Sequence, residues 1–313
     1  MSLLLLLVSL PTLYWPGGVE SAAALKAAGI ERLAVPVEQA EAWRKAGFDV
    51  APVSAGDLAA REKVEAPGLA VEITLASATR NPWVSASGWI FQRKSAGRYY
   101  YNELPAGRAV LAGAEAYAYG ADALLKIDPT DVGAFGGLLA FLKDLPPREL
   151  PAVADLGVVD DGSDDVGEVM NLLARRNLLF EPLVKPSPKF RINVELGTAE
   201  YPKEDAGDPS EFAAKVRRQL TDEARTLRVY GSDVVIGRVS GDGSHARVHV
   251  LNYGGRPIET LRVRLRGAWG RGEGYVAGRG KVALEDYAME GGVTEFTLTA
   301  VGVYVIADLP AIH

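Results

Sequence analysis

The feature that most constrains the fold is a change of pattern near Ser232. Before it, short β-branched or apolar runs alternate with helical patterns, which is typical of βα units around a parallel sheet. After it, apolar and polar residues alternate between Gly-rich turns without a helical period, which is typical of antiparallel strands with one solvated face. We therefore expect an α/β domain over residues 1–230 and an antiparallel β-sandwich over residues 231–313.

The first part repeats its βα unit with short, regular spacing. Leu13–Trp15, Arg32–Val35 and Asp49–Val53 are the first three expected strands, and helical patterns separate them. About eight such runs occur by residue 184, the number that a (β/α)8 TIM barrel needs, although the segment is short for that barrel. A second partition stays open, in which an incomplete barrel ends at a boundary near 146–152 and a flavodoxin-like unit follows.

The second part has the pattern of a small sandwich. Val234–Val239 and Ala246–Leu251 flank a Gly-rich turn and predict a hairpin. In Thr260–Arg266, Leu and Val alternate with Arg, which places the three arginines on a solvated face. His249 lies between two valines of an alternating strand, so we expect it on the solvent side.

Composition and charge exclude several classes of function. The chain has no Cys, which excludes disulfides, thiolate metal sites and Cys nucleophiles, and it has only 3 His. The net charge is −6 and the Lys and Arg residues are dispersed, so no basic face for nucleic acid is expected. Carboxylate, Tyr, Lys and Arg chemistry remains, and we expect neither a metal nor another cofactor.

The N-terminal run Leu3–Leu10 allows two interpretations. It has about the length of the hydrophobic part of a secretory signal, but no Lys or Arg precedes it. It is too short to span a membrane, so no membrane span is expected. It is either a buried first strand or an export signal, and with the export signal we expect a periplasmic or secreted protein in preference to a cytoplasmic one.

Carboxylates mark the ends of several expected strands. In parallel α/β proteins ligands bind at the carboxyl ends of the strands. Glu103 follows Tyr99–Asn102, Asp128 follows Leu124–Ile127, and Glu181 interrupts a later apolar run. Glycoside hydrolysis needs two carboxyl groups, one to protonate the leaving oxygen and one to attack or to activate water. These three residues are therefore the candidate catalytic groups.

Each carboxylate also has a structural interpretation. Glu103 precedes an Ala-rich helix and Asp128 precedes a Pro, so both suit a helix start or a turn. The acidic run Asp160–Asp165 offers oxygen ligands for a cation. Because Asp165 and Glu168 fit a capping box, we favour a helix start there.

Aromatic and loop residues supply the candidate binding groups. A flat aromatic ring matches the apolar face of a sugar ring, although aromatic residues also fill protein cores. A long loop follows the expected strand Leu69–Leu75, and loops of that length are often functional. The candidate substrate-binding residues are Trp15, Arg80, Asn81, Trp83, Tyr101 and Asn102.

Three segments together resemble the carbohydrate-active TIM-barrel proteins that carry a C-terminal β-sandwich. They are Tyr14–Gly18 after the first strand, Asn102–Glu103 at a strand end, and the closing strands around Thr294–Thr297 and Val303–Val305. In many retaining glycosidases an Asn-Glu pair at a strand end supplies the acid/base. The resemblance implies that role for Glu103, with Asp128 or Glu181 as nucleophile or second base.

Leu156–Glu181 also resembles the glutamine-amidotransferase-like domain that follows some glycosidase barrels, which implies a structural or oligomerising module. Two functions stay open: a glycoside hydrolase that uses a carboxylate pair, and a non-catalytic glycan-binding or assembly protein on the same frame. A carbohydrate or another small molecule is the expected ligand, and self-association into a homo-oligomer stays open. A nucleotide-binding protein is disfavoured because no GxGxxG or GxxxxGK[ST] follows a strand.

Overall fold

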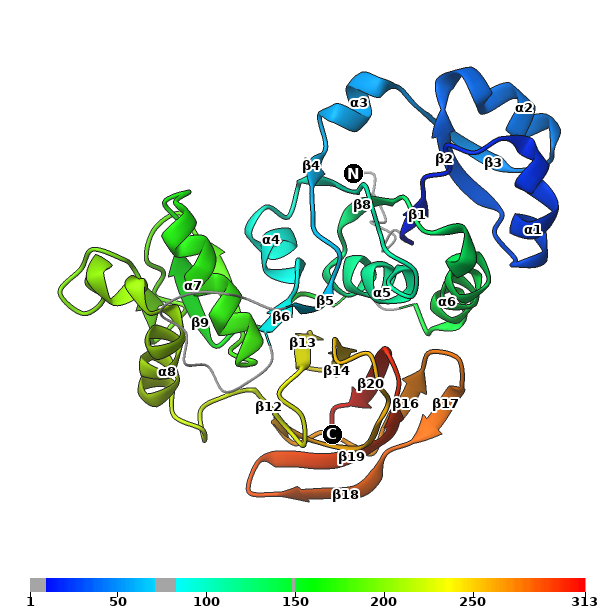
Figure 1. Ribbon diagram of the computed structural model, residues 1–313. Coiled ribbons are helices and arrows are strands. Elements are labelled where there is room, and N and C mark those ends of the chain that lie inside the picture. The colour runs from blue at the N-terminus through cyan, green and yellow to red at the C-terminus, as the bar shows by residue number, and fades with distance from the viewer. Residues whose placement is uncertain (1–9, 71–82, 148–149, 313) are drawn as a thin grey trace, which may run out of the picture. The chain divides into compact units, whose positions relative to one another are not determined.

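The computed structural model describes residues 10–70, 83–147 and 150–312 (Figure 1). Residues 1–9 of the N-terminal run and the binding candidates Arg80 and Asn81 lie outside these ranges. The chain divides into two compact units, Met1–Gly68 with Ser85–Glu149 and Leu69–Val84 with Leu150–His313.

The first unit is built on six parallel strands. They are β1 (Thr12–Leu13), β2 (Arg32–Pro36), β3 (Asp49–Val53), β4 (Glu62–Lys63), β7 (Arg98–Tyr101) and β8 (Asp122–Leu125). Strand β1 pairs with β8, β8 with β7, β7 with β4, and β2 with β3. A parallel bridge between Tyr14 and Ala34 connects β1 to β2, so the spatial order is β3-β2-β1-β8-β7-β4. Within the described ranges β3 and β4 do not pair, and the barrel stays open.

Short helices follow these strands. They are α1 (Ala22–Ala27), α2 (Ala40–Lys45), α3 (Ala55–Ala59), α4 (Gly88–Arg93), α5 (Ala109–Tyr119) and α6 (Val132–Asp144), with 3-10 turns η1 (Val19–Ser21), η2 (Val37–Gln39) and η3 (Pro129–Asp131). Helix α2 buries Trp43 completely. Helix α5 ends at Gly120, whose φ of 65° is the left-handed conformation that glycine adopts without a steric penalty.

Successive side chains of the sheet point to opposite faces, as the period of a strand requires. On one face Tyr14, Ala34, Tyr100 and Leu124 form a small buried cluster, which we call the tyrosine face. The rings of Tyr14 and Tyr100 meet edge to face, with their centroids 5.7 Å apart. The tyrosine face is thus formed by residues of four neighbouring strands.

The second unit begins with a small parallel sheet. Its strands β9 (Leu156–Val159), β10 (Phe180–Leu183) and β11 (Asn193–Val194) lie in the order β10-β9-β11, and helices α7 (Asp164–Arg175) and α8 (Pro209–Leu220) accompany them. Helix α7 is capped by Ser163, whose hydroxyl accepts the Val166 N–H. The expected Asp165–Glu168 capping box is therefore wrong, because the N-cap is Ser163, two residues before Asp165.

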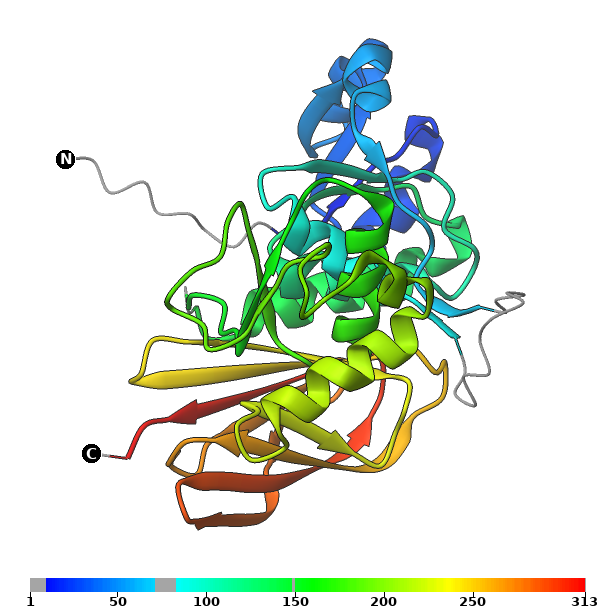
Figure 2. The same ribbon diagram turned by 90° about the vertical axis from the view of Figure 1, so that its left-hand side faces the viewer.

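Within the described ranges, nine strands form the sandwich of the second unit. Figure 1 and Figure 2 show this sandwich from two directions, coloured yellow to red. One sheet has the order β12-β15-β19-β18 and the other β13-β14-β20-β16-β17, with every pairing antiparallel. The strands are β12 (Leu227–Tyr230), β13 (Val235–Gly241), β14 (His245–Asn252), β15 (Ile258–Arg266), β16 (Glu273–Val276), β17 (Gly280–Ala283), β18 (Glu285–Glu290), β19 (Val293–Val301) and β20 (Tyr304–Pro310). This confirms the predicted α/β body with a C-terminal antiparallel sandwich.

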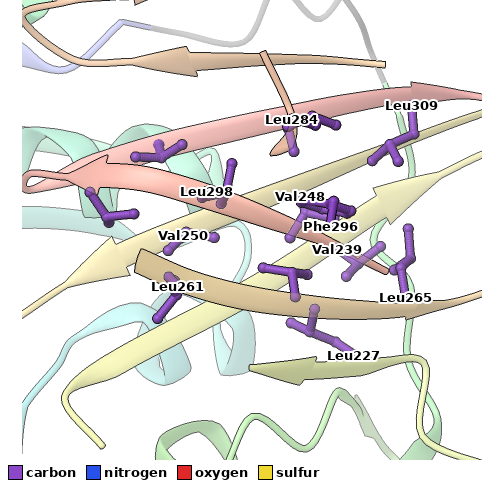
Figure 3. Close-up of a cluster of buried hydrophobic side chains, with 14 of the residues drawn as sticks. Leu227, Val239, Val248, Val250, Leu261, Leu265, Leu284, Phe296, Leu298 and Leu309 are labelled. Atoms are coloured by element: carbon purple, nitrogen blue, oxygen red, sulfur yellow. The ribbon is translucent and has the colours of Figure 1, made fainter. Parts of the chain in front are cut away.

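The sandwich has one continuous apolar core. Figure 3 shows Val248, Leu261, Phe296 and Leu298 within it, from strands β14, β15 and β19. Leu179, which precedes β10, belongs to the same cluster, and the Asp155 carboxylate accepts hydrogen bonds from the Thr226 N–H and hydroxyl at 2.9 and 2.5 Å. The small parallel sheet and the sandwich therefore fold as one unit.

A polar layer lies on the opposite face of strands β14 and β20. Arg247 binds Asp308 through two nitrogen atoms, at 2.6 and 2.7 Å. His249 is 5% exposed, and its Nδ1 atom forms a 2.7 Å hydrogen bond with the Tyr304 hydroxyl. The expectation of a solvent-facing His249 is therefore wrong. Its partner comes from a strand 55 residues away, which the local pattern does not reveal.

Protonation of His249 should oppose folding. Burial, together with Arg238 and Arg247, holds its pKa well below the ordinary 6.5. The unfolded chain gains a proton near that pH and the folded chain does not, so stability present above pH 6.5 is lost as the pH falls, by up to about 1.4 kcal/mol per pH unit. We expect urea unfolding at pH 7.5 and 5.5 to show a smaller pH effect in His249→Gln than in wild type. His245→Gln, on the same strand, should behave as wild type, and an unchanged pH effect in His249→Gln would contradict the buried neutral ring.

Adjacent glycines of α6 should respond oppositely to alanine. A Cβ on Gly136 would lie 1.9 Å from the Ala28 carbonyl oxygen at the end of α1, whereas one on Gly137 would meet nothing within 4 Å. Gly136→Ala should lower the free energy of unfolding by about 1–3 kcal/mol, and Gly137→Ala should raise it by about 0.5–1 kcal/mol. Thermal or urea unfolding measures both, and a stabilising Gly136→Ala would refute the close helix contact.

Candidate functional site

The segments after β7 and β8 lie side by side at the carboxyl edge of the sheet. The Lys126 N–H donates to the Tyr101 carbonyl at 2.9 Å, and the Leu104 N–H donates to the Lys126 carbonyl at 3.3 Å. Together the two segments line a pocket of about 430 Å³ that is open to solvent. Its lining residues are Glu103, Leu104, Pro105, Lys126, Ile127, Asp128 and Pro129. The structure thus brings the candidates Glu103 and Asp128 into one pocket.

Asp128 is held by its own loop. Its Oδ1 atom accepts hydrogen bonds from the Thr130 N–H at 2.9 Å and from the Thr130 hydroxyl at 2.5 Å. The hydroxyl bond and then the backbone bond lower the pKa of Asp128, because both stabilise the charged form. Asp128 is therefore an ionised carboxylate at neutral pH, with a fixed orientation at the pocket wall.

Asp131 joins the two walls of the pocket. This buried residue follows β8, and its carboxylate accepts hydrogen bonds from the Gly107 N–H at 2.8 and 2.9 Å and from the Ala109 N–H at 3.2 Å. These groups lie at the start of α5, the helix after β7, where an anion also favours the helix dipole. The loop after β8 therefore caps the helix that follows β7 and keeps the two segments in register.

Two further charges of the pocket have no protein partner. Glu103 is exposed and Lys126 is partly buried, and neither forms an ion pair or a side-chain hydrogen bond within the described ranges. The pocket thus combines two carboxylates with one ammonium group. Charged groups left without partners at the carboxyl edge of a parallel sheet are suited to recognise a polar ligand.

Trp15 and Asn102 lie next to this edge. The Trp15 ring is buried and folds back over its own loop, where its Nε1–H donates to the Ser21 hydroxyl at 2.8 Å. A Cβ on Gly17 would lie 2.8 Å from the same Nε1 atom, so the Pro-Gly-Gly turn is what lets the ring lie there. Asn102 is partly buried and directly precedes Glu103.

The other described candidates have different surroundings. Tyr101 is fully buried on the face of the sheet opposite Tyr100, and its hydroxyl donates to Glu115 Oε2 at 2.8 Å. Glu181 belongs to the second unit, on β10, where it pairs with Lys189 at 2.5 Å. The ring of Trp83, also in the second unit, lies 4.0 Å from the Arg175 guanidinium. The described structure groups none of the three with Glu103 and Asp128.

Glu115 explains why Tyr101 is turned inward. Its Oε1 atom accepts the N–H groups of Ser87 and Gly88, at 2.8 and 3.1 Å, at the start of α4. Tyr101 and these two N–H groups thus surround one buried carboxylate on α5. Burial, and next the charge of Glu115, raise the pKa of Tyr101 well above its ordinary 10.0.

Sequence reasoning did not select Lys126, Tyr14 or Tyr100 as site residues. Lys126 interrupts an apolar strand end, which was an available signal, since a charge there faces the carboxyl edge. Burial, then the neighbouring Tyr14 and Glu103, raise the pKa of Tyr100 to about 12. Burial and the charge of Glu38 raise the pKa of Tyr14.

The described ranges contain neither a metal-binding cluster nor a membrane-spanning helix. No group of three or more His, Asp or Glu side chains in these ranges is placed to hold a metal ion. None of the helices found there has the length and apolar character needed to cross a membrane.

The comparisons with known proteins concern the fold. No protein-family model matches the chain, and no curated protein matches its sequence. Among solved structures, α-L-fucosidase isoenzyme 2 from Paenibacillus thiaminolyticus is similar, with a TM-score of 0.54, 8% identity, and coverage of 71% of this chain and 62% of the fucosidase. β-Galactosidase from Bacillus circulans sp. alkalophilus has a TM-score of 0.43, 10% identity, and coverage of 88% and 63%.

The likeness to the fucosidase shows that the chain has a glycoside-hydrolase-like fold. The chain spans less than two thirds of the length of the fucosidase. The predicted resemblance to glycoside-hydrolase-like proteins is therefore confirmed at the level of the fold. Function depends on the residues of the site.

Neighbouring tyrosines of β7 should differ in their contribution to stability. Tyr101→Phe removes the hydroxyl that donates to the buried Glu115 carboxylate, so the free energy of unfolding should fall by about 1.5–3 kcal/mol. Tyr100→Phe removes no hydrogen bond among the described residues and should stay within about 0.5 kcal/mol of wild type. Urea unfolding compares the two variants, and equal losses would contradict the opposite orientation of these side chains.

Proposed function

We propose that this protein binds carbohydrate in the pocket between the segments after β7 and β8, with Glu103 and Asp128 as its ligand-binding carboxylates. One observation carries the proposal: two carboxylates from adjacent strand ends line a single pocket of about 430 Å³. Small-ligand pockets span roughly 300–1,000 Å³. The glycoside-hydrolase-like fold supports a sugar as the ligand, by analogy of fold.

The chemistry of the pocket suits a polyhydroxylated ligand. An ionised carboxylate accepts hydrogen bonds through two oxygen atoms, and charge-assisted bonds of this kind are stronger than neutral ones. The Oδ1 atom of Asp128 accepts both hydrogen bonds from Thr130. Its Oδ2 atom has no hydrogen-bond partner among the described residues, so it can bind a ligand. Lys126 adds hydrogen-bond donors to the same pocket.

Hydrolysis of a glycosidic bond is the second candidate function, and the shared pocket of the two carboxylates favours it. In that reaction Asp128, with its lowered pKa, would be the ionised nucleophile or base, and Glu103 would protonate the leaving oxygen. We place binding first because the pocket draws its carboxylates from two neighbouring strand ends, whereas barrel enzymes assemble theirs from several.

A glycan array followed by isothermal titration calorimetry tests binding. The array presents neutral, amino and acidic oligosaccharides, and the tightest ligand is titrated into each variant. Glu103→Gln and Asp128→Asn should each weaken binding about tenfold or more, because a charge-assisted hydrogen bond is lost. Glu41→Gln, which alters an exposed carboxylate paired with Lys45 on α2, should bind as wild type. A wild-type protein that binds no sugar would overturn the proposal.

Turnover of chromogenic aryl glycosides separates the two functions. If wild type releases the aryl group and Glu103→Gln does not, while both bind the same oligosaccharide, the protein is a hydrolase. If wild type binds oligosaccharide without turnover on any aryl glycoside, it is a binding protein.

A further inference from the structure

Tyr14 and Tyr100 expose little of their rings and yet keep their hydroxyls unpaired. They are 8% and 6% exposed, respectively, and among the described residues neither hydroxyl has a hydrogen-bond partner. Neither oxygen is among the fully enclosed polar atoms without a partner, so each hydroxyl still reaches solvent. Two rings that pack edge to face on the tyrosine face thus each carry a hydroxyl without a partner among the described residues.

Other buried tyrosines of the protein satisfy their hydroxyls internally. The Tyr99 hydroxyl donates to the Lys94 carbonyl at 2.7 Å, and the Tyr101 hydroxyl donates to Glu115 at 2.8 Å. In the second unit the Tyr201 hydroxyl binds Gln219 at 2.8 Å. Buried tyrosine hydroxyls generally find such partners. The hydroxyls of Tyr14 and Tyr100 therefore remain free to bind a partner from outside the chain.

The surroundings of this pair are acidic. Burial, and next the charge of Glu38 just after β2, raise the pKa of Tyr14, and burial, then Tyr14 and Glu103, raise that of Tyr100, so both phenols stay protonated and can donate. The backbone connects the pair to the pocket, because the Tyr14 N–H donates to the carbonyl of Leu125 at 2.8 Å and Tyr100 pairs with Leu124, two residues before the lining residue Lys126. Hydroxyl donors beside carboxylate acceptors match the paired donor and acceptor character of sugar hydroxyls.

We propose that Tyr14 and Tyr100 belong to the sugar-binding site and donate hydrogen bonds to a sugar that carries no carboxylate or sulfate group. This inference rests on the proposed function and names its ligand class. The two carboxylates of the pocket, Glu103 and Asp128, outnumber the single ammonium group of Lys126, and like charges brought together disfavour an anionic ligand. Neutral and amino sugars meet both requirements, since they carry hydroxyls that accept hydrogen bonds and they have no negative charge.

The test uses the full chain with tyrosine-to-phenylalanine variants, which keep the ring packing. Wild type, Tyr14→Phe, Tyr100→Phe and the double variant are titrated with the tightest array ligand, and with the hexasaccharides of glucose, glucosamine and galacturonic acid. Tyr230→Phe is the matched control, since Tyr230 is exposed on β12 in the second unit. Thermal unfolding verifies that every variant is folded.

We expect the double variant to bind the array ligand at least tenfold more weakly than wild type, and Tyr230→Phe to bind it equally. The galacturonic acid hexasaccharide should not bind. Equal affinity of the double variant and wild type, or preferred binding of the galacturonic acid hexasaccharide, would overturn this inference while leaving sugar binding intact. Failure of wild type to bind any sugar would instead overturn the proposed function and the inference with it.

Discussion

The candidate site depends on the hydrogen bonds that the Asp131 carboxylate accepts. This carboxylate accepts three backbone hydrogen bonds at the start of α5, although it belongs to the loop after β8. A buried carboxylate without such donors would be costly, and the first N–H groups of a helix need acceptors, so each satisfies the other. The strand pairing of β7 with β8 brings the loops close, and Asp131 then fixes them. Glu103 and Asp128 gain their common pocket from this arrangement.

Much of the fold follows from local patterns. Asp49–Val53 is a strand as expected, and the strand-end rule selected Glu103 and Asp128, because an apolar run that ends in a carboxylate places it at the sheet edge. The strand-end rule does not predict to which face of the sheet each of two adjacent side chains points. Tyr100 and Tyr101 are adjacent in a run of three tyrosines and point to opposite faces of the sheet. Tyr101 contacts Glu115 on one face and Tyr100 packs against Tyr14 on the other, and both partners are distant in sequence.

Strand partners are not contained in local sequence. The apolar runs of β9 and β10 resemble those of β7 and β8, yet β9 pairs with β10 and β11 in the second unit. Strand β4 has only two residues and pairs with β7, which is distant in sequence, so no hydrophobic periodicity predicts this strand. The same limit applies to His249, since its pattern matches an exposed position and only Tyr304, on another strand, makes burial favourable.

The open sheet has two edge strands, β3 and β4, to which strands of other chains could add. An unpaired strand edge is a template for strands of other chains. The exposed Pro52 in β3 has no N–H to donate to a further strand, and β4 is short and carries Glu62, which pairs with Lys94. Both ends of the six-strand order are therefore poor acceptors of an additional strand. The chain can therefore keep an open sheet without offering its edges to strands of other chains.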